Sequence, residues 1–301
     1  MLKDTFKKNK NVKFAILFFT ILIGIRLRVH YALNNAYFVN DQGRDLMILQ
    51  NMLERGYPIT IGPSTSFFTK YGNIPFGPYY YYFLFPFFLI SKHPYFITLV
   101  FITLFSLIAF WILKLKNLSF MEKLIFLLLF SFSLNSIYHT TFIWNLNLAM
   151  LLGFLTFLFF LQKKEWILAS NLRTFVFSLA LGAIFQIHYA LFFLLAGIGI
   201  KIAKENVKKL FPFLLGFFTS FFPFVIFEIR HNFLITKMFL QLPLETRENN
   251  LRINLVQTFI DLSQFYFPFL IKFKTLHLLI GTLLSLFLIA YPKRFSTKLF
   301  F

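Results

Sequence analysis

Long apolar stretches alternate with short polar connections along most of the chain. A helix needs about 20 mostly apolar residues to cross a bilayer, and eight stretches approach or reach that length. They are 13–33, 94–113, 120–138, 146–161, 172–187, 189–203, 209–227 and 273–291. The pattern therefore predicts an all-α integral membrane protein, a bundle of about eight transmembrane helices.

A ninth apolar segment, 77–91 ("GPYYYYFLFPFFLIS"), is shorter and contains Pro78 and Pro86. Its four consecutive tyrosines are typical of the headgroup level of a membrane. If this segment does not cross, 18 of the 30 basic residues fall on the N-terminal side of the bundle. Because positive charge gathers on the cytoplasmic side, we expect a helix in the outer interface, with 34–93 and 228–272 as outer segments.

The composition agrees with a membrane protein, because 58% of the 301 residues are hydrophobic and only 14% are charged. No polar stretch is long enough for a soluble domain, so 1–301 is expected to be one transmembrane domain. The net charge of +19 lies mainly in short connections, which indicates membrane topology and not nucleic-acid binding. The first apolar run lacks a small-residue cleavage site, so we do not expect a removable signal peptide. A multi-pass chain rich in Lys, Asn, Ile and Phe suits a bacterial plasma membrane.

A cluster of charges follows the first predicted span, in a chain with only eleven acids. Asp41, Arg44 and Asp45 are spaced i, i+3 and i+4, so on a helix they share one face, and the leucines of 41–55 take another. The segment is predicted to form an amphipathic helix that rests on the bilayer, with Asn40 as its N-cap. Ordinary capping with a local ion pair remains the alternative to a functional site.

Four further polar residues lie on the predicted outer side. Arg230 and His231 follow the seventh span, where an arginine suits a phosphate held at the membrane surface. Snorkelling, or pairing with Glu228, is the alternative for Arg230. His188 and Asn145 occupy tight outer corners, where hydrogen bonding at a helix end is the alternative to ligand binding.

The sequence gives little indication of a metal site. Cysteine is absent, and the six histidines are scattered without metal-ligand spacing. A divalent cation held by Asp41 and Asp45 is an alternative, since hard cations take carboxylates, but the arginine between the acids disfavours it. We therefore expect no cofactor.

Charges in the predicted membrane interior are almost absent, with Arg26 and Arg28 lying toward the outer end of the first span. Transporters usually need such charges at mid-depth and often show an internal repeat, which this chain lacks. Both features disfavour a transporter.

Six segments occur in the order "DQGRD", "IGPSTS", "FGPYYYY", "FIWNLNL", "QIHYALFF" and "FPFVIFEIRHNFL". Together they resemble the membrane glycosyltransferases of the GT-C fold, in particular the bacterial branch similar to family 39, the protein mannosyltransferase-like enzymes. The resemblance runs from about residue 14 to 240. It implies outer juxtamembrane helices in the first loop and an outer active site that faces a lipid-linked sugar. The acidic motif of the family maps onto Asp41, but its common Asp-Glu pair is Asp41-Gln42 here.

The resemblance leads to a hypothesis for the reaction: one sugar passes, with inversion, from a polyprenyl-phosphate donor to a hydroxyl of a lipid, glycan or protein acceptor. Asp41 would be the general base and Arg230 the first choice for the phosphate. Weaker choices for the phosphate are His231 and Lys70, and the supporting residues are Arg44, Asp45, Asn145 and His188. The alternatives are a truncated or non-catalytic relative, and a transporter or polymerase of lipid-linked saccharides.

Overall fold

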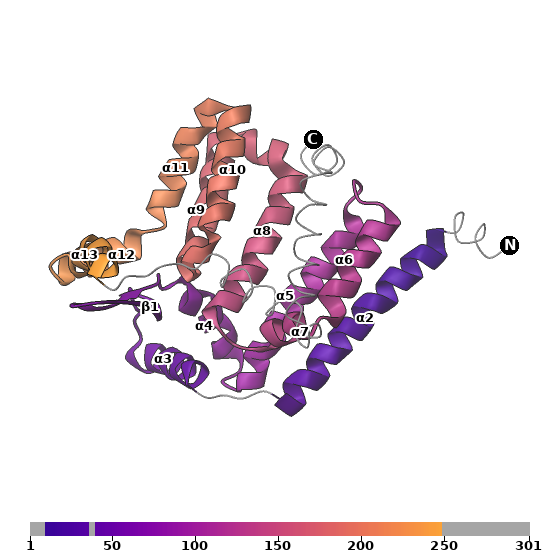
Figure 1. Ribbon diagram of the computed structural model, residues 1–301, viewed down its shortest axis with the longest axis horizontal. Coiled ribbons are helices and arrows are strands. Elements are labelled where there is room, and N and C mark those ends of the chain that lie inside the picture. The colour runs from indigo at the N-terminus through magenta and orange to yellow at the C-terminus, as the bar shows by residue number, and fades with distance from the viewer. Residues whose placement is uncertain (1–9, 36–39, 249–301) are drawn as a thin grey trace.

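Helices make up most of the protein, as the apolar pattern predicts (Figure 1). The computed structural model describes residues 10–35 and 40–248. The predicted span 273–291 and the end of the outer segment 228–272 lie outside these residues. The described elements are α2 (Lys10–Asn35), α3 (Asp41–Arg55), β1 (Ser64–Thr69), β2 (Gly72–Pro75), α4 (Tyr79–Ile90), α5 (Pro94–Lys114), α6 (Phe120–Phe132), α7 (Leu134–Thr141), α8 (Asn145–Leu168), α9 (Asn171–Ile187), η1 (Tyr189–Leu191), α10 (Phe192–Glu205), η2 (Val207–Lys209), α11 (Leu210–Thr219), α12 (Phe222–Arg230) and α13 (Leu234–Glu248).

The first seven predicted spans fall on helices, but fewer of these helices have the length and composition of a membrane span. Within the described residues, α5 and α8 are each long and apolar enough to cross a membrane. The total rises to four if two bent pairs, α6 with α7 and η2–α11 with α12, each form one span. The all-α membrane class is therefore supported, with two to four candidate spans in the described part of the chain.

Both bends have local causes. The axes of α6 and α7 differ by 63°, because Ser133 between them has an extended backbone (φ −63°, ψ 126°) that interrupts the helical ladder. The helices α11 and α12 differ by 46°, and Pro223 lies in the first turn of α12, where proline begins a new helix readily. Each bend divides an apolar run that the sequence pattern shows as continuous.

The helix α4 is too short to cross a bilayer. Its 12 residues extend about 18 Å, against a hydrocarbon core of about 30 Å. Tyr80 and Tyr81 are fully buried, because α4 packs against α3, α5 and α9. These two tyrosines are therefore covered by protein and do not face lipid, whereas the expectation that the four tyrosines lie at the headgroup level stays a prediction.

A β-hairpin interrupts the otherwise helical first loop, and the all-α prediction missed it. The strands β1 and β2 pair antiparallel, with Ser64 opposite Pro75 and Thr69 opposite Gly72. Gly72 adopts φ 113°, a conformation that favours glycine, and the Asn73 side chain donates to the Thr65 carbonyl at 2.9 Å. The helix α13 packs against both strands.

The closest helix–helix approach that small residues permit joins α9 to α11. A Cβ on Gly216 would lie 2.2 Å from Ser178 Oγ, and one on Gly182 would lie 2.4 Å from Ser220 Oγ. Each helix therefore presents two small residues four positions apart to its neighbour. This is the small-xxx-small packing that lets backbones approach closely in membranes.

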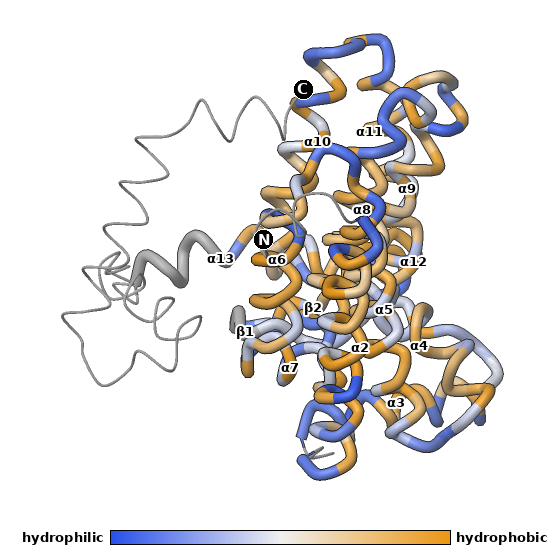
Figure 2. Tube along the Cα trace, turned by 90° about the vertical axis from the view of Figure 1, so that its right-hand side faces the viewer, coloured by the Kyte–Doolittle hydropathy of each residue, from blue (hydrophilic) through white to orange (hydrophobic). Residues whose placement is uncertain are grey.

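Hydrophobic residues dominate the long helices, and they form both the interior and much of the exterior (Figure 2). The main core joins α2, α3, α4, α5, α6 and α8, and a second core joins α8, α9, α10 and α11. Large apolar side chains such as Phe193 and Phe211 point outward, with 83% and 74% of their surface exposed. Such outer faces are expected where the surrounding solvent is lipid.

Candidate functional site

The segments predicted to lie outside meet at one end of the bundle (Figure 1). In the corner after α9, the Tyr189 hydroxyl donates to the Pro75 carbonyl of the hairpin at 2.8 Å. At the start of α8, Asn145 Nδ2 donates to the Ile187 carbonyl at 3.0 Å. The first loop, both short corners and the start of 228–272 are thus in contact with one another, directly or through the hairpin.

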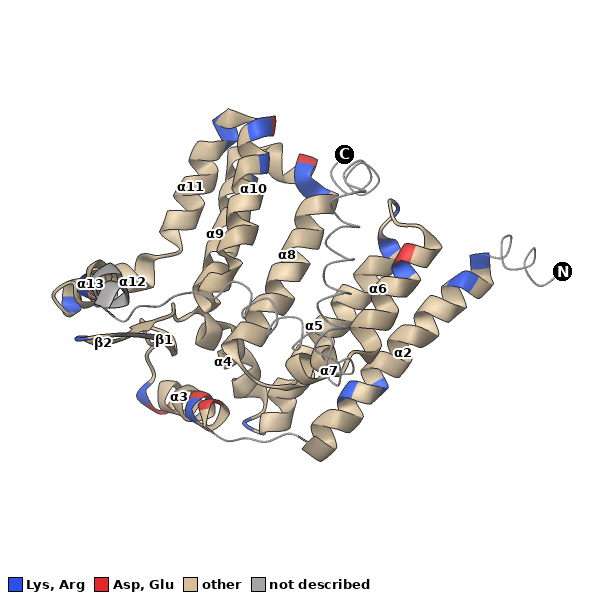
Figure 3. Ribbon diagram, viewed as in Figure 1, with Lys and Arg blue, Asp and Glu red and all other residues tan. Residues whose placement is uncertain are grey.

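Most Lys and Arg residues of the helix connections lie at the opposite end of the bundle from α3 (Figure 3). They lie in the last turns of α5, α8 and α10 and in the connections after them, whereas Asp41, Asp45 and Glu54 all belong to α3. This separation agrees with the charge pattern along the sequence. The assignment of the basic end to the cytoplasm stays a prediction from the positive-inside rule.

One guanidinium bridges the two acids at the start of α3. Arg44 Nη1 donates to Asp41 Oδ1 at 2.9 Å, and Arg44 Nε and Nη2 donate to Asp45 Oδ1 at 3.0 and 2.8 Å. The prediction that these three residues share a helix face is confirmed. The prediction that Asn40 caps the helix is wrong, because its φ of 50° is not the extended conformation of an N-cap and its side chain makes no capping bond.

The two acids have opposite environments. The Asp41 side chain is 53% exposed, whereas that of Asp45 is 1% exposed and lies on the buried face of α3 with Leu49 and Met52. The expected amphipathic helix is present, but the leucines do not all take a face apart from the charges, because Leu49 lies beside Asp45, and this face packs against α4 and the core instead of resting on lipid. Asp41 is therefore the acid that an external substrate can reach.

Two adjacent tyrosines of α4 surround the buried carboxylate. The Tyr81 hydroxyl donates to Asp45 Oδ1 at 2.8 Å. Asp45 Oδ2 accepts no hydrogen bond of good geometry from the described residues, and the Tyr80 hydroxyl, which also acts on Asp45, forms none either. Burial raises the pKa of Asp45, although Arg44 and the tyrosine hydroxyls act in the opposite direction, and burial likewise raises the pKa of Tyr81.

Arg230 ends α12 with an exposed side chain that makes no hydrogen bond or ion pair with any described residue. The alternative pairing with Glu228 does not form. The Glu228 carboxylate instead accepts from the backbone N–H groups of Ile235 (2.7 Å) and Thr236 (3.1 Å) and from the Thr236 hydroxyl. It thereby satisfies the start of α13, where a helix has free donors, and leaves Arg230 available to a ligand.

His231 directly follows Arg230 at the end of α12, Lys70 lies in the turn between β1 and β2, and both are exposed. The His231 ring stacks on Phe227 at 3.9 Å, and its Nδ1 donates to the Phe227 carbonyl at 2.8 Å. The other ring nitrogen, Nε2, takes no part in this hydrogen bond. Lys70 Nζ lies 5.1 Å from the centre of the Tyr71 ring. In Figure 1 the hairpin lies between α3 and the pair α12–α13. The structure therefore brings the acids together but does not bring the candidate cations into contact with them.

His188 and Asn145 make the helix-end hydrogen bonds that the sequence left as the alternative. His188 Nδ1 accepts from the Ala190 N–H at 3.1 Å, and burial lowers the pKa of the ring, so it is neutral with its proton on Nε2. Its ring lies 4.7 Å from that of Phe76, which follows the hairpin. Both residues connect the corners to their neighbours.

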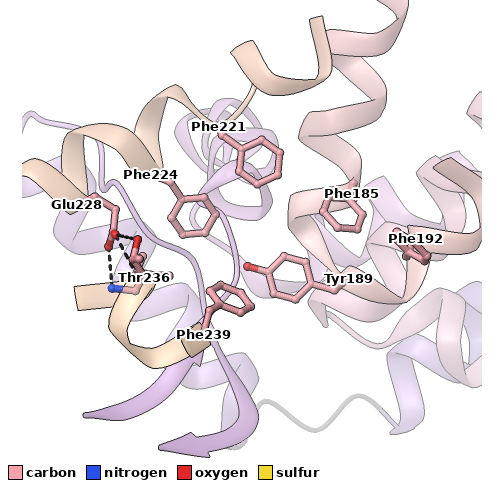
Figure 4. A pocket seen from close by; sticks show the side chains of 9 residues that line it. Phe185, Tyr189, Phe192, Phe221, Phe224, Glu228, Thr236 and Phe239 are labelled. Atoms are coloured by element: carbon pink, nitrogen blue, oxygen red, sulfur yellow. Dashed lines mark hydrogen bonds between the residues drawn. The ribbon is translucent and has the colours of Figure 1, made fainter. Parts of the chain in front are cut away.

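An apolar cavity of about 480 Å³ lies on the α12 and α13 side of this end (Figure 4). It is lined by Phe185, Tyr189, Phe192, Phe221, Phe224, Glu228, Ile235, Thr236 and Phe239. On one side of the cavity, Glu228 and Thr236 supply polar atoms. The hydroxyl of Tyr189 in the cavity wall is already bonded to the Pro75 carbonyl of the hairpin. The abundance of phenylalanine along the chain gave no signal for this position, because the cavity combines residues from distant segments.

Arg28 is a buried charge whose environment was not predicted. It belongs to α2, and its side chain is enclosed by α6 and α7, with its guanidinium carbon 3.4 Å from the centre of the Phe105 ring. Its acceptors are Thr140 Oγ1, Ser136 Oγ and the carbonyls of Gly24, Phe130 and Ser131. All five N–H groups are used, so Arg28 offers no donor to a ligand.

In the described part of the chain, no group of three or more His, Asp or Glu residues could hold a metal ion. Arg44 also lies between the only two acids considered for a cation. Comparison with known protein families, curated proteins and solved structures gives no match. The resemblance to glycosyltransferases thus stays a hypothesis based on the sequence motifs and the site.

Proposed function

We propose that this protein is a multi-pass plasma-membrane glycosyltransferase, with about eight spans, that uses a polyprenyl-phosphate sugar donor. The observation that carries the proposal is the pair of unlike acids on α3. A buried carboxylate, Asp45, holds Arg44, and Arg44 holds the exposed carboxylate of Asp41. An exposed acid held in one direction is what a general base requires, and it lies at the end of the bundle where the loops meet.

In the proposed reaction, Asp41 takes the proton of an acceptor hydroxyl as the hydroxyl oxygen attacks the anomeric carbon. The bond from that carbon to the phosphate oxygen breaks on the opposite face, so the configuration inverts and the phosphate leaves with the bonding electron pair. General base catalysis of this kind contributes about 10²–10⁴-fold. The rest of the acceleration must come from positioning and from stabilisation of the leaving group.

The leaving phosphate gains negative charge as the bond breaks, and a cation aimed at it stabilises the transition state. Arg230 suits this task because it is exposed and unpaired among the described residues, with His231 and Lys70 as weaker choices. The apolar cavity supports the same placement. Glu228, two residues before Arg230, is part of its wall, and its aromatic lining suits the isoprenoid tail of a donor.

The test is transfer of radiolabelled sugar from a panel of polyprenyl-phosphate donors, in membranes that contain wild type, Asp41→Asn or Glu54→Gln. Glu54 is a matched control, since it is an exposed acid on the same helix that accepts from Gln50 at 2.6 Å. We expect a labelled product with wild type and Glu54→Gln and none with Asp41→Asn. No transfer by inserted, intact wild type would contradict the proposal, and full transfer by Asp41→Asn would remove Asp41 from the site.

No specific observation favours the alternative of a transporter of lipid-linked saccharides. Within the described helices, the buried Arg28 is the kind of charge that such a protein would use along its path. Its five N–H groups are already bonded to neutral acceptors, so it is not open to a passing ligand.

A further inference from the structure

Asp45 is a buried carboxylate with an unusual set of contacts. Its Oδ1 accepts three hydrogen bonds, two from Arg44 and one from the Tyr81 hydroxyl, and its Oδ2 accepts none from the described residues. Burying a charge is costly unless it is paired and hydrogen-bonded. The residue that requires this pairing is Asp45, and its partner Arg44 is therefore held tightly even though Arg44 is 40% exposed.

The geometry of the guanidinium carries this constraint to the surface. Arg44 uses one edge, Nε and Nη2, for Asp45, and its remaining nitrogen, Nη1, for Asp41. Because the guanidinium is planar, fixing one edge also fixes the direction of Nη1. An exposed Arg–Asp pair alone contributes only about 0–1 kcal/mol and moves freely, so the buried acid provides the rigidity.

We propose that Asp45 is a positioning residue, which anchors Arg44 from below and thereby fixes the direction of the Asp41 carboxylate. Its catalytic consequence rests on the proposed function, whereas the anchoring itself does not. Asp45 is 1% exposed and does not touch substrate. It acts through Arg44, and Tyr81 holds Asp45 in turn.

The anchoring is tested without any transfer assay, by labelling arginines of the full-length protein with a dicarbonyl reagent and measuring each site by mass spectrometry. Arg55 is the internal reference, because it is an exposed arginine at the other end of α3. We expect Arg44 to react severalfold faster, relative to Arg55, in Asp45→Leu than in wild type. Asp45→Asn keeps one acceptor oxygen, so its ratio of Arg44 to Arg55 labelling should lie between those of wild type and Asp45→Leu. An unchanged ratio in Asp45→Leu would overturn the anchor.

Adjacent tyrosines give a matched pair of control variants for the same labelling. Tyr81→Phe removes a bond to Asp45 and should raise the reactivity of Arg44, whereas Tyr82→Phe removes a hydroxyl that bonds to the Ile59 carbonyl and not to Asp45. Equal labelling of Arg44 in the two variants would contradict the part assigned to Tyr81.

The catalytic consequence is tested by kinetics per folded molecule. Because misplacement by about 1 Å costs up to about 100-fold, we expect Asp45→Leu to lower kcat by about 10- to 100-fold with little change in the KM for the donor. The double variant Asp45→Leu with Arg44→Gln should lose no more than Arg44→Gln alone, since both act in one chain. A purely structural Asp45 would reduce the amount of folded protein and leave kcat unchanged. No transfer by wild type would contradict the proposed function, and the labelling ratio would still decide the anchor.

Discussion

Arg28 provides the sharpest test of how this bundle is held together. The extended backbone at Ser133 ends α6 and frees its last carbonyls, and no backbone N–H from the described part of α7 bonds to those of Phe130 and Ser131. The guanidinium donates to both, at 2.6 and 3.0 Å, and also reaches Ser136 on α7. Arg28 thus caps the C-terminus of α6, where a positive charge is also favoured by the helix dipole.

We predict that Arg28→Met destabilises the protein by about 2–4 kcal/mol. Methionine keeps an apolar stem of similar length but donates nothing. Phe130 retains the Ser136 hydroxyl at 2.7 Å, so the main loss is the Ser131 carbonyl, and a buried group left unsatisfied costs about 1–3 kcal/mol. The interaction of the charge with the helix end adds about 1 kcal/mol.

Unfolding of the detergent-solubilised protein measures this effect, with Arg26→Met as the control. Arg26 is exposed on the same helix, so its replacement should change stability by about 0.5 kcal/mol or less. Arg28→Lys keeps the charge but has three donors in place of five, so we expect an intermediate loss. If Arg28→Met equals or exceeds wild type in stability, the cost of burying the charge outweighs its hydrogen bonds, and our account of the bend is wrong.

Three further predictions use the same unfolding measurement. Tyr81→Phe should cost about 1.5–3 kcal/mol, because its hydroxyl bonds to a charged group, and unchanged stability would contradict the contact with Asp45. Gly216→Ala should cost about 1–3 kcal/mol through overpacking, while the control Gly197→Ala, whose Cβ meets nothing within 4 Å, should gain about 0.5–1 kcal/mol. Because burial raises the pKa of Asp45, its contribution to stability is fully present below the unfolded pKa of about 3.9 and is lost as the pH rises through the raised native pKa. The stability of wild type relative to Asp45→Asn should therefore fall from pH 4 upward, and a rising difference would contradict the direction of the pKa shift.

The sequence pattern predicted the helices well because most apolar runs end at a charged or proline-containing connection. The predicted span 94–113, for example, falls on α5, Pro94–Lys114. It failed at 64–75, where the strands form one short hairpin whose apolar residues show no helical or alternating signal strong enough to separate them from a loop. It also failed to show the two bends, since Ser133 looks like any other small residue within an apolar run.

The candidate site was predicted in part, for a related reason. Spacing at i, i+3 and i+4 places Asp41, Arg44 and Asp45 on one face, but it does not show which edge of that face another helix covers. That depends on α4, whose tyrosines the sequence assigned to the headgroup level. Once Tyr80 and Tyr81 turn inward, Asp45 is enclosed and Asp41 is not, so two acids of equal chemistry acquire different tasks.

The contacts of Arg28 and Arg44 differ in which N–H groups stay open to a ligand or substrate, and this difference supports assigning Arg28 to structure and Arg44 to function. Arg28 is surrounded by neutral acceptors, mostly backbone carbonyls, which satisfy every N–H group and leave no valence for a ligand. Backbone acceptors have no sequence signature, which explains why its burial was not predicted. Arg44 is satisfied on its buried edge alone, and its other edge meets an exposed carboxylate at the end where the loops converge. The contact between Arg44 and the exposed Asp41 adds little to stability, because exposed ion pairs contribute only about 0–1 kcal/mol. The direction of Arg44 is therefore better explained by a role in orienting Asp41 toward an external substrate.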